Sequence, residues 1–335
     1  MRVFLTVLLV WFYTCARCAS LGPPPEHPPP ELESEFLMGG RVPLDRFFVD
    51  DTYGGEGSHY KFPRAQVDRM VEQASVQLRP LESLSPSVLR SAAAKWPPTS
   101  QYKRQVVYAA LALHRDLVAG QACAVIGSME PWVEAALLSL GASTVVTIEY
   151  NRLTYDHPQL TTIAGPDFPA LYAAQSPYRH RFSLVVSISA FDHDGLGRYG
   201  DPVNPNGDLE AMQRTALLLA PAGRLLLTIP LGPDVVVWNL HRRYGSLRLP
   251  LMLDGWRVID SVGGLSDWVD TSNALLRSAP EVGSSDSREH HAAVASSSAA
   301  ASELLNAPRN WRQTIEPVWV LSPRPLPSGS TQSEL

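Results

Sequence analysis

The sequence predicts a doubly wound α/β fold of the Rossmann type, with about seven mostly parallel strands and an N-terminal helical extension. Short apolar runs alternate with helical patterns over residues 121–325. Residues 122–150 read as strand, glycine turn, helix and second strand, and an acid, Glu149, ends the second strand. A polar loop follows the apolar run Phe182–Ser189. Because ligands of open α/β sheets bind at the carboxyl ends of strands, Glu149 and this loop predict a binding site.

The N-terminus is typical of a secretory signal. Arg2 precedes an apolar stretch, Val3–Tyr13, and small residues follow up to Ser20. We expect residues 1–20 to be a cleaved signal peptide or a short uncleaved anchor, because the stretch is too short to span a bilayer comfortably. The protein is therefore expected in the secretory pathway, secreted or in the ER or Golgi lumen, with no stable membrane span unless this segment is retained.

Composition sets further limits on the class of protein. The chain has 335 residues, is 45% hydrophobic and carries a formal net charge of −5, which allows one large domain and gives no reason to expect a nucleic-acid partner. Only Cys123 lies beyond the signal segment, so no intrachain disulfide forms after cleavage. We expect Cys123 to be a small, buried apolar residue of a strand.

The elements are expected in a definite order. Residues 21–62 comprise a Pro-rich spacer, extended and disordered, and an irregular segment, and a helical region follows at 63–120 with helices over 64–78 and 100–118. The α/β domain, 121–325, has its predicted strands at 122–127, 143–149, 159–163, 182–189, 224–230, 255–262 and 317–322, and its predicted helices at 131–140, 167–175, 207–219 and 234–244. Seven strands, of which the last two meet after a long connection, match the methyltransferase variant of this fold.

The long connection before the last strand contains a segment rich in Ser and Ala, residues 278–305. We expect it to be a low-complexity surface insertion, and its His290-His291 pair to be solvated rather than bound to a metal. Residues 326–335 are expected to be a disordered tail.

The turn at Gly127 suits a nucleotide-like ligand. A glycine lets the backbone approach the ligand, the following helix offers its N-terminus, and Glu149 can accept two hydrogen bonds from ribose hydroxyls. Only the first glycine of the dinucleotide fingerprint is present, and Glu130 puts negative charge where a pyrophosphate would sit. S-adenosylmethionine carries a positive sulfonium and no phosphate, so it tolerates that acid. The alternative is a plain βαβ unit without a ligand.

The loop after the fourth predicted strand concentrates ionisable side chains, namely Asp192, His193, Asp194, Arg198, Tyr199, Asp201 and Asp208. Three roles are open. His193 is a candidate general base oriented by Asp192 or Asp194. The carboxylates are candidate ligands for Mg²⁺ or Ca²⁺. Or the loop is a turn-rich connector whose aspartates cap backbone N–H groups. We expect Asp208 to mark the start of the next helix.

A further polar cluster falls in the predicted helix 234–244 and consists of Asn239, His241, Arg242, Arg243 and Tyr244. Adjacent arginines point to different faces of a helix, so at most one of them enters a cleft, where it can bind an acidic or hydroxylated acceptor. The alternative is a solvated helix end with cations near its C-terminus.

Four motifs resemble those of a family of unknown function, DUF268: VIGSMEPWVE at 125–134, TIEY at 147–150, HDGLGRYGDP at 193–202 and WNLHRRYG at 238–245. The resemblance covers about residues 100–265, and the family is similar to class I S-adenosylmethionine-dependent methyltransferases. It implies that Gly127 faces the methionine moiety, that Glu149 faces the ribose, and that Ser189 and His193 border the cofactor and the acceptor. Met129 stands where the wider superfamily has a second glycine.

These observations predict a methyltransferase of the secretory pathway that transfers a methyl group from S-adenosylmethionine to an oxygen or nitrogen acceptor, a small molecule or a glycan hydroxyl. The predicted site has His193 and Asp194 as catalytic residues, Gly127, Ser128, Glu149 and Ser189 at the cofactor, Arg198, Tyr199, Asp201, Asn239 and Arg242 at the acceptor, and no metal. Two alternatives remain: a nucleotide-sugar transferase that depends on Mg²⁺ or Mn²⁺, and a non-catalytic module that binds a partner through the Arg198–Asp201 loop.

Overall fold

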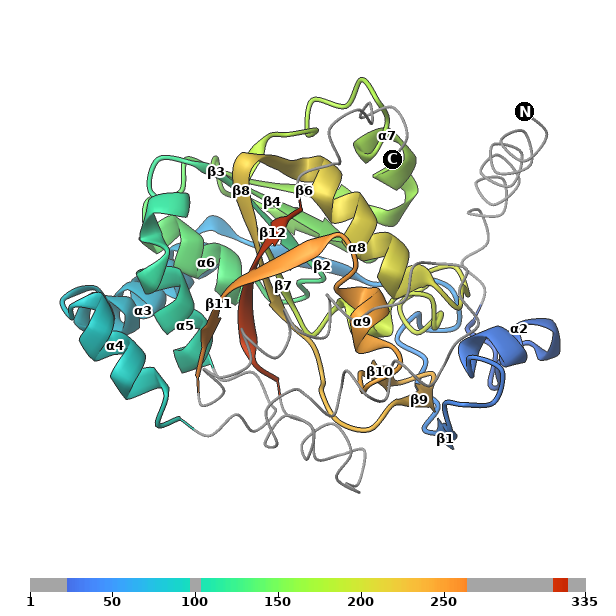
Figure 1. Cartoon of the computed structure of the whole chain (residues 1–335). Helices are drawn as coiled ribbons and strands as arrows, with labels where there is room; N and C mark the ends of the chain where they lie inside the picture. Colours follow the sequence, from blue (N-terminus) through green and yellow to red (C-terminus); the bar gives the residue numbers. More distant parts are fainter. Residues whose placement is uncertain (1–22, 97–103, 264–315, 325–335) are drawn as a thin grey trace.

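The computed structural model describes residues 23–96, 104–263 and 316–324 (Figure 1). The predicted signal or anchor segment, the low-complexity insertion with its histidine pair and the C-terminal tail all lie outside the described residues. Within the described parts of the chain, no helix combines the length and apolar character needed to cross a membrane.

The central sheet confirms the predicted fold class. Seven strands lie in the order β11-β12-β8-β7-β3-β4-β6. The strands are β3 (Ala122–Ile126), β4 (Thr144–Glu149), β6 (Leu160–Ala164), β7 (Phe182–Ile188), β8 (Leu219–Thr228), β11 (Trp256–Val262) and β12 (Val318–Pro323). Neighbours pair in parallel from β6 to β8, whereas β12 is inserted antiparallel between β8 and β11. The last two strands therefore meet after the long connection, as predicted.

Helices cover both faces of this sheet (Figure 1). One face packs against α3 (Arg64–Glu82), α4 (Pro86–Ala93), α5 (Arg104–Leu113) and α6 (Trp132–Ser139), and the other against α7 (Phe168–Leu171), α8 (Gly207–Leu218) and α9 (Leu249–Met252). Alternation along β3 shows why the sheet needs both layers: Cys123 and Val125 face the first core, and Ala124 faces the second. Cys123 is fully buried, as predicted, and burial raises the pKa of its thiol to about 12.

The segment expected to be irregular carries a helix and two short strands, α2 (Pro30–Phe36), β1 (Leu44–Arg46) and β2 (His59–Phe62). β2 pairs in parallel with β5 (Arg152–Tyr155), an element the sequence reasoning missed. The Pro-rich stretch before α2 lies against the protein rather than extending into solvent: Pro24 and Pro28 are buried, and the indole of Trp238 donates to the Pro25 carbonyl at 3.0 Å.

The predicted helix over 234–244 is wrong. Residues Val235–Trp238 form β9 and His241–Arg243 form β10, an antiparallel hairpin to which β1 adds in parallel. All seven residues of the two strands are buried, and three consecutive valines favour an extended backbone over a helix. Asp234 does not begin a helix, because its carboxylate accepts the backbone N–H groups of Gly245, Leu247 and Arg248 and so closes the loop after the hairpin.

One other boundary differs from the prediction: the helix expected at 167–175 is the single turn Phe168–Leu171, preceded by a 3₁₀ turn at Gly165–Asp167. The helix predicted at 207–219 is α8, with Asn206 at the N-cap position, and Asp208 lies at its start as expected, fully buried in the first turn. Its partners, described below, explain why an acid at this point is not a simple helix cap.

Candidate active site

A cavity of about 340 Å³ lies at the carboxyl ends of β3, β4 and β7. β3 is the strand from which the chain order runs outward in both directions, to β4 and β6 on one side and to β7 and β8 on the other. Crevices at such a switch point are where doubly wound sheets bind ligands. The volume also falls within the roughly 300–1,000 Å³ of typical small-molecule sites. This cavity is therefore the candidate active site.

The cavity brings together seven of the eleven predicted site residues. They are Gly127, Ser128, Glu149, Ser189, His193, Asp194 and Tyr199. The four residues predicted at the cofactor and the two predicted as catalytic are all among them, whereas only one of the five predicted at the acceptor is.

Gly127 makes the closest approach between the two turns that floor the cavity. Its backbone is in the left-handed region, with φ +75°, and its N–H donates to the Ile148 carbonyl at 2.9 Å. A Cβ at this position would lie 2.2 Å from the Cβ of Ala190, in the turn after β7. Both the conformation and the space therefore require glycine.

Glu149 ends β4 at the rim of the cavity and is 6% exposed. Its Oε1 accepts the backbone N–H of Asn151 at 3.1 Å and the Asn151 amide at 3.3 Å. Burial raises the pKa of this carboxyl to about 7, although the hydrogen bonds from Asn151 oppose the shift. Near neutral pH the carboxyl therefore passes between its charged and uncharged forms, and a ligand that donates hydrogen bonds to it favours the charged form.

An aromatic wall lines the cavity beside Glu149. The ring of Tyr150 lies 5.0 Å from that of Phe168, and Phe168 lies 6.3 Å from Tyr172. Tyr150 follows β4 and the other two follow β6, so the wall closes the part of the cavity next to the Glu149 carboxyl. A flat, apolar ring system would stack on such a wall.

Two serines set the shape of the backbone around the cavity. Ser189, directly after β7, has φ +47°, an unusual value for a residue other than glycine. Its N–H donates to both the carbonyl and the hydroxyl oxygen of Thr228, each at 3.0 Å, which holds this conformation. The Ser128 hydroxyl points to the protein, with the Glu130 carbonyl and the Glu134 carboxyl each at 3.1 Å.

His193 lines the cavity, but both of its ring nitrogens face protein atoms. Nδ1 lies 2.5 Å from the carbonyl of Leu240 and must donate to it, and Nε2 lies 3.5 Å from Oδ2 of Asp192. Burial and the neighbouring Arg198 lower the pKa of the imidazole to about 4, so it is uncharged near neutral pH. A proton would reach Nε2 only if that nitrogen turned from Asp192 toward the cavity.

Asp194 is the second predicted catalytic residue on the cavity wall. Its carbonyl accepts from the guanidinium of Arg242 at 2.5 Å, so the cation bonds the backbone rather than the carboxyl. Burial first, then the nearby Asp201 and Asp208, raise the pKa of the Asp194 carboxyl well above its usual range. A cationic ligand group in the cavity would lower that pKa again.

Four residues predicted at the acceptor do not line the cavity. Asp201 accepts the backbone N–H groups of Gly195, Gly197 and Tyr199, so it shapes its own loop. Arg198 donates to Asp51 at 2.7 Å. These contacts match the connector alternative, in which the loop aspartates cap backbone groups.

Asn239 and Arg242, the other two, are buried by the hairpin. The amide oxygen of Asn239 accepts the N–H of Val49 at 2.8 Å. Arg242 is 1% exposed and donates to the carbonyls of Asp194, Asn204 and Pro205. The assignment of Arg242 to an exposed helix end or to a substrate is not supported, because every direction of its guanidinium faces the protein interior.

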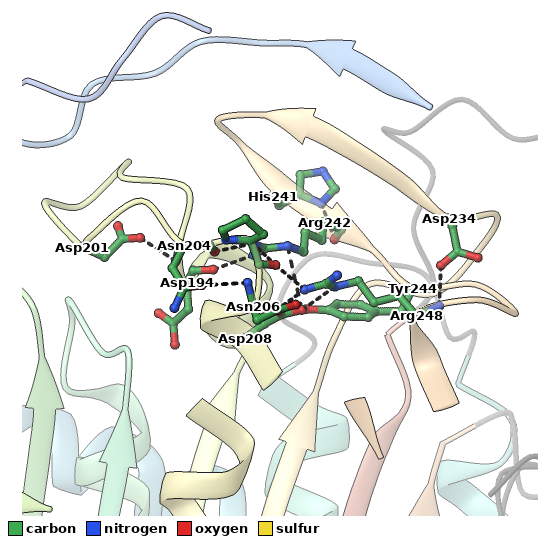
Figure 2. A network of polar contacts seen from close by, with 12 residues as sticks. Asp194, Asp201, Asn204, Asn206, Asp208, Asp234, His241, Arg242, Tyr244 and Arg248 are labelled. Carbon is green, nitrogen blue, oxygen red and sulfur yellow. Dashed lines mark hydrogen bonds and ion pairs between the residues drawn. The ribbon is translucent and has the colours of Figure 1, made fainter. Parts of the chain in front are cut away.

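Figure 2 shows the polar network to which Arg242 belongs. At its centre the Asp208 carboxylate accepts from the Tyr244 hydroxyl at 2.9 Å and from Arg248 at 2.5 and 2.8 Å. Burial alone would raise the pKa of Asp208, but Arg242 and Arg248 outweigh it and lower the pKa. The network connects α8 and the polar loop to the hairpin, and through Arg242 it holds the backbone of Asp194, which lines the cavity.

Several cavity residues escaped the sequence reasoning, namely Arg104, Trp132, Tyr150, Phe168, Tyr172 and Arg214. Tyr150 stands beside Glu149 in the TIEY motif and could have been found there. The two arginines are held by neighbouring acids, Arg104 by Glu130 at 3.2 Å and Arg214 by Glu210. Among the residues that the structure describes, no group of three or more His, Cys, Asp or Glu is placed to hold a metal ion.

The protein has a Rossmann-like α/β fold with a cavity at the switch point of its sheet. Residues 120–285 match the model of the family described as Caenorhabditis protein of unknown function, DUF268, which confirms the resemblance predicted from the sequence. No curated protein matches the chain.

Solved structures similar to this chain include an S-adenosylmethionine-dependent methyltransferase from Mesorhizobium loti, at 16% identity and a TM-score of 0.23, over 34% of this chain and 49% of that one. This chain thus spans about half the length of that enzyme. A methyltransferase from Thiobacillus denitrificans in complex with S-adenosyl-L-homocysteine has 16% identity and a TM-score of 0.34, over 71% and 97% of the two chains. The YcgJ protein from Bacillus subtilis has 12% identity and a TM-score of 0.29, over 63% and 94%.

Proposed function

We propose that this protein is a methyltransferase that uses S-adenosylmethionine. The observation that carries the proposal is the cavity at the switch point, in which a glycine turn after β3 faces an acid at the tip of β4. These two features are what a nucleoside-bearing ligand without phosphates requires: close backbone approach at one end and a carboxylate for a ribose diol at the other.

The residues of the cavity fit this cofactor. Glu149 would accept the ribose hydroxyls, and the wall formed by Tyr150 and Phe168 would receive the adenine ring. Gly127 and Ser128 line the cavity and would lie beside the methionine part. Asp194 and Glu149 are carboxyls on the same cavity wall, which favours a ligand that carries positive charge.

When bound, the cofactor supplies an activated methyl group, and the protein has to hold the acceptor in line with it. Positioning of this kind provides much of the rate enhancement of a two-substrate reaction. Asp194 is the residue best placed to bind the acceptor, because its carboxyl borders the cavity and Arg242 holds its backbone. His193, with both nitrogens facing protein atoms, shapes the wall next to it.

The proposal is tested by comparing ligands in a thermal unfolding assay of the full chain. A ligand that binds only the folded state stabilises it by RT ln(1 + L/Kd), where L is the ligand concentration, so the melting temperature rises with the logarithm of that concentration once it exceeds Kd. S-adenosylmethionine and S-adenosylhomocysteine are expected to raise it, and NAD and UDP-glucose with Mn²⁺ are not. Stabilisation by UDP-glucose with Mn²⁺ and none by S-adenosylmethionine would favour the nucleotide-sugar transferase instead.

A non-catalytic module that binds the same cofactor is the second candidate. One observation favours it: both ring nitrogens of His193 face protein atoms, so the predicted general base is not presented to a ligand. The two candidates separate by the product. An enzyme forms S-adenosylhomocysteine when offered amines, small hydroxylated molecules or glycans, and the module binds S-adenosylmethionine without forming it.

The location and the acceptor class also belong to the proposal. Arg2 and the apolar stretch Val3–Tyr13 support entry into the secretory pathway, where a glycan hydroxyl or a small molecule would be available as acceptor. Expression of the full chain in eukaryotic cells, followed by N-terminal sequencing, tests this. A new N-terminus near Ser20 in the medium or lumen supports secretion, and a cytosolic chain that begins at Met1 contradicts it.

A further inference from the structure

Glu134 is a fully buried acid beneath the glycine turn. It is the third residue of α6, its side chain is 0% exposed, and it takes part in no ion pair among the described residues. A carboxyl in such a place costs free energy unless its oxygens are hydrogen-bonded. Its contacts therefore show what the acid is there to hold.

Three hydroxyl groups converge on the Glu134 carboxyl, and they come from three different elements. The Thr147 hydroxyl of β4 donates to Oε1 at 2.7 Å, and the Tyr155 hydroxyl of β5 lies 3.5 Å from the same oxygen. The Ser128 hydroxyl, in the turn after β3, lies 3.1 Å from Oε2. One side chain thus links the glycine turn to β4 of the central sheet and to β5 of the two-stranded sheet.

The link reaches the two sides of the proposed cofactor site. Ser128 directly follows Gly127, and Thr147 precedes Glu149 by two residues, so Thr147 and Glu149 lie on the same face of β4. The turn and the tip of β4 are the parts assigned to the methionine moiety and to the ribose. The Glu134 carboxyl therefore adds a side-chain link between the turn and β4 to the backbone hydrogen bond from the Gly127 N–H to the Ile148 carbonyl.

Counting the protons available between Ser128, Glu130 and Glu134 indicates whether the Glu134 carboxyl is charged or uncharged when it bonds Ser128. Ser128 has one hydroxyl proton but two acceptors at 3.1 Å, the Glu130 carbonyl and the Glu134 carboxyl. If Glu134 carries a proton on Oε2, that proton serves Ser128 Oγ while the Ser128 proton serves the carbonyl, and both contacts are hydrogen bonds. Burial raises the pKa of Glu134, which is the direction this arrangement needs.

We propose that Glu134 is a positioning residue that, as an uncharged acid, holds the Gly127–Ser128 turn in register with β4 and so preorganises the cofactor site. The inference rests on the proposed function for the identity of the ligand, but the positioning itself is a property of the protein without ligand. Glutamine has the same shape, accepts with its carbonyl and donates with its amide, so it preserves the link. Alanine removes it: Ser128 keeps its bond to the Glu130 carbonyl, and Thr147 and Tyr155 keep their contact with each other, but no side chain joins the turn to the two strands.

The first test measures S-adenosylmethionine affinity by calorimetry for the full chain and its variants. Glu134→Ala is expected to weaken binding about tenfold or more, the lower end of the effect of losing an outer-shell partner. Glu134→Gln is expected to bind as the natural chain does. Asp260→Asn is the matched control, because Asp260 is also a buried acid with two side-chain donors, Arg90 and His114, but lies on β11 outside the cavity.

The second test needs no ligand and measures hydrogen exchange of the backbone amides from Gly127 to Glu130. Exchange there is expected to become faster in Glu134→Ala, and in Ser128→Ala if the larger change unfolds the chain, while Glu134→Gln and Asp260→Asn leave it unchanged. Natural exchange rates in Glu134→Ala, or Glu134→Gln behaving as Glu134→Ala does, would overturn the inference. A natural chain that shows the expected exchange pattern but binds no S-adenosylmethionine would overturn the proposed function alone.

Discussion

Gly127 and Ala190 touch across the switch point of the sheet, so closely that a Cβ on Gly127 would lie 2.2 Å from the Ala190 Cβ. Gly127 begins the turn after β3, Ala190 lies in the turn after β7, and both residues line the cavity. The separation of the two turns, and with it the shape of the site, is set by the absence of a single side chain.

Gly127→Ala is accordingly expected to destabilise the fold and to impair ligand binding. Gly120→Ala is the matched control, because Gly120 has nearly the same backbone conformation, φ +72° against +75°, with nothing within 4 Å of the added Cβ. Both variants suffer the strain of a left-handed alanine, of order 1 kcal/mol, and Gly127→Ala adds an overpacking cost of about 1–3 kcal/mol. Urea unfolding of the two variants measures the difference. Equal losses of unfolding free energy would show that the protein accommodates the added methyl group beside Ala190 without an overpacking cost.

The buried acid at the tip of β4 is expected to make the ligand-free protein less stable as the pH rises. The folded-state pKa of Glu149 is raised from 4.5 to about 7, so the folded chain holds a proton that the unfolded chain has lost between these values. Relative to Glu149→Gln, the natural chain should therefore lose up to about 3 kcal/mol of unfolding free energy between about pH 4.5 and pH 7. Denaturant titrations of both proteins across this range measure it. A difference that does not change with pH would contradict the assigned environment of Glu149.

Removing the carboxylate at the centre of the hairpin network should be strongly destabilising. Asp208→Ala leaves Arg248 and the Tyr244 hydroxyl buried without their acceptor, and loss of one partner of a buried ion pair costs about 3–5 kcal/mol. Asp68→Asn is the control, since the Asp68 side chain is 53% exposed and its contacts with Arg64 and His157, each at 3.6 Å, should contribute less than about 1 kcal/mol apiece. Thermal unfolding compares the two, and similar small losses in both would show that the network is not required for stability.

A second acid is expected to make the protein sensitive to low pH. Burial would raise the pKa of Asp260, but the bonds from His114 and Arg90 outweigh it and lower the pKa to about 2. The stabilisation that the charged Asp260 carboxylate provides is fully present above the pKa of this group in the unfolded chain, about 4, and is lost as the pH falls from 4 to 2. Because Arg90 is 45% exposed, we expect about 1–2 kcal/mol rather than the full shift. The unfolding free energies of the natural chain and of Asp260→Asn, measured by denaturant titration, should differ by this amount at pH 5 and become equal near pH 2.

The sequence was sufficient to predict the strands of the central sheet but not the β9–β10 hairpin beside it. Continuous apolar runs such as Phe182–Ile188 occur where a parallel strand is covered on both faces, and all seven predicted strands are present. The run Val235–Trp238 gave no comparable signal, because a short apolar segment fits a buried helix or a buried strand equally well. Its strand character depends on pairing with β1, some 190 residues earlier in the chain.

The candidate site likewise contains residues that could be predicted from the sequence and residues that could not. Residues at the carboxyl ends of strands, such as Gly127 and Glu149, could be placed from the sequence because the fold brings these ends of parallel strands together. Arg242 could not, since its role depends on a hairpin that the sequence did not reveal. Glu134 was also missed, because a charged residue in the first turn of a helix ordinarily faces solvent or the helix N-terminus.

The central claim is that the cavity binds S-adenosylmethionine through Glu149. Calorimetric titration of this compound into the full chain at pH 8 tests it most directly. Glu149→Gln is measured in parallel, and Glu72→Gln, at an exposed position of α3, is the control. We expect saturable binding with one site per chain, unchanged in Glu72→Gln and severely weakened in Glu149→Gln, whose uncharged amide has one acceptor oxygen where the carboxylate has two. No binding by the folded natural chain, or equal binding by Glu149→Gln, would contradict it.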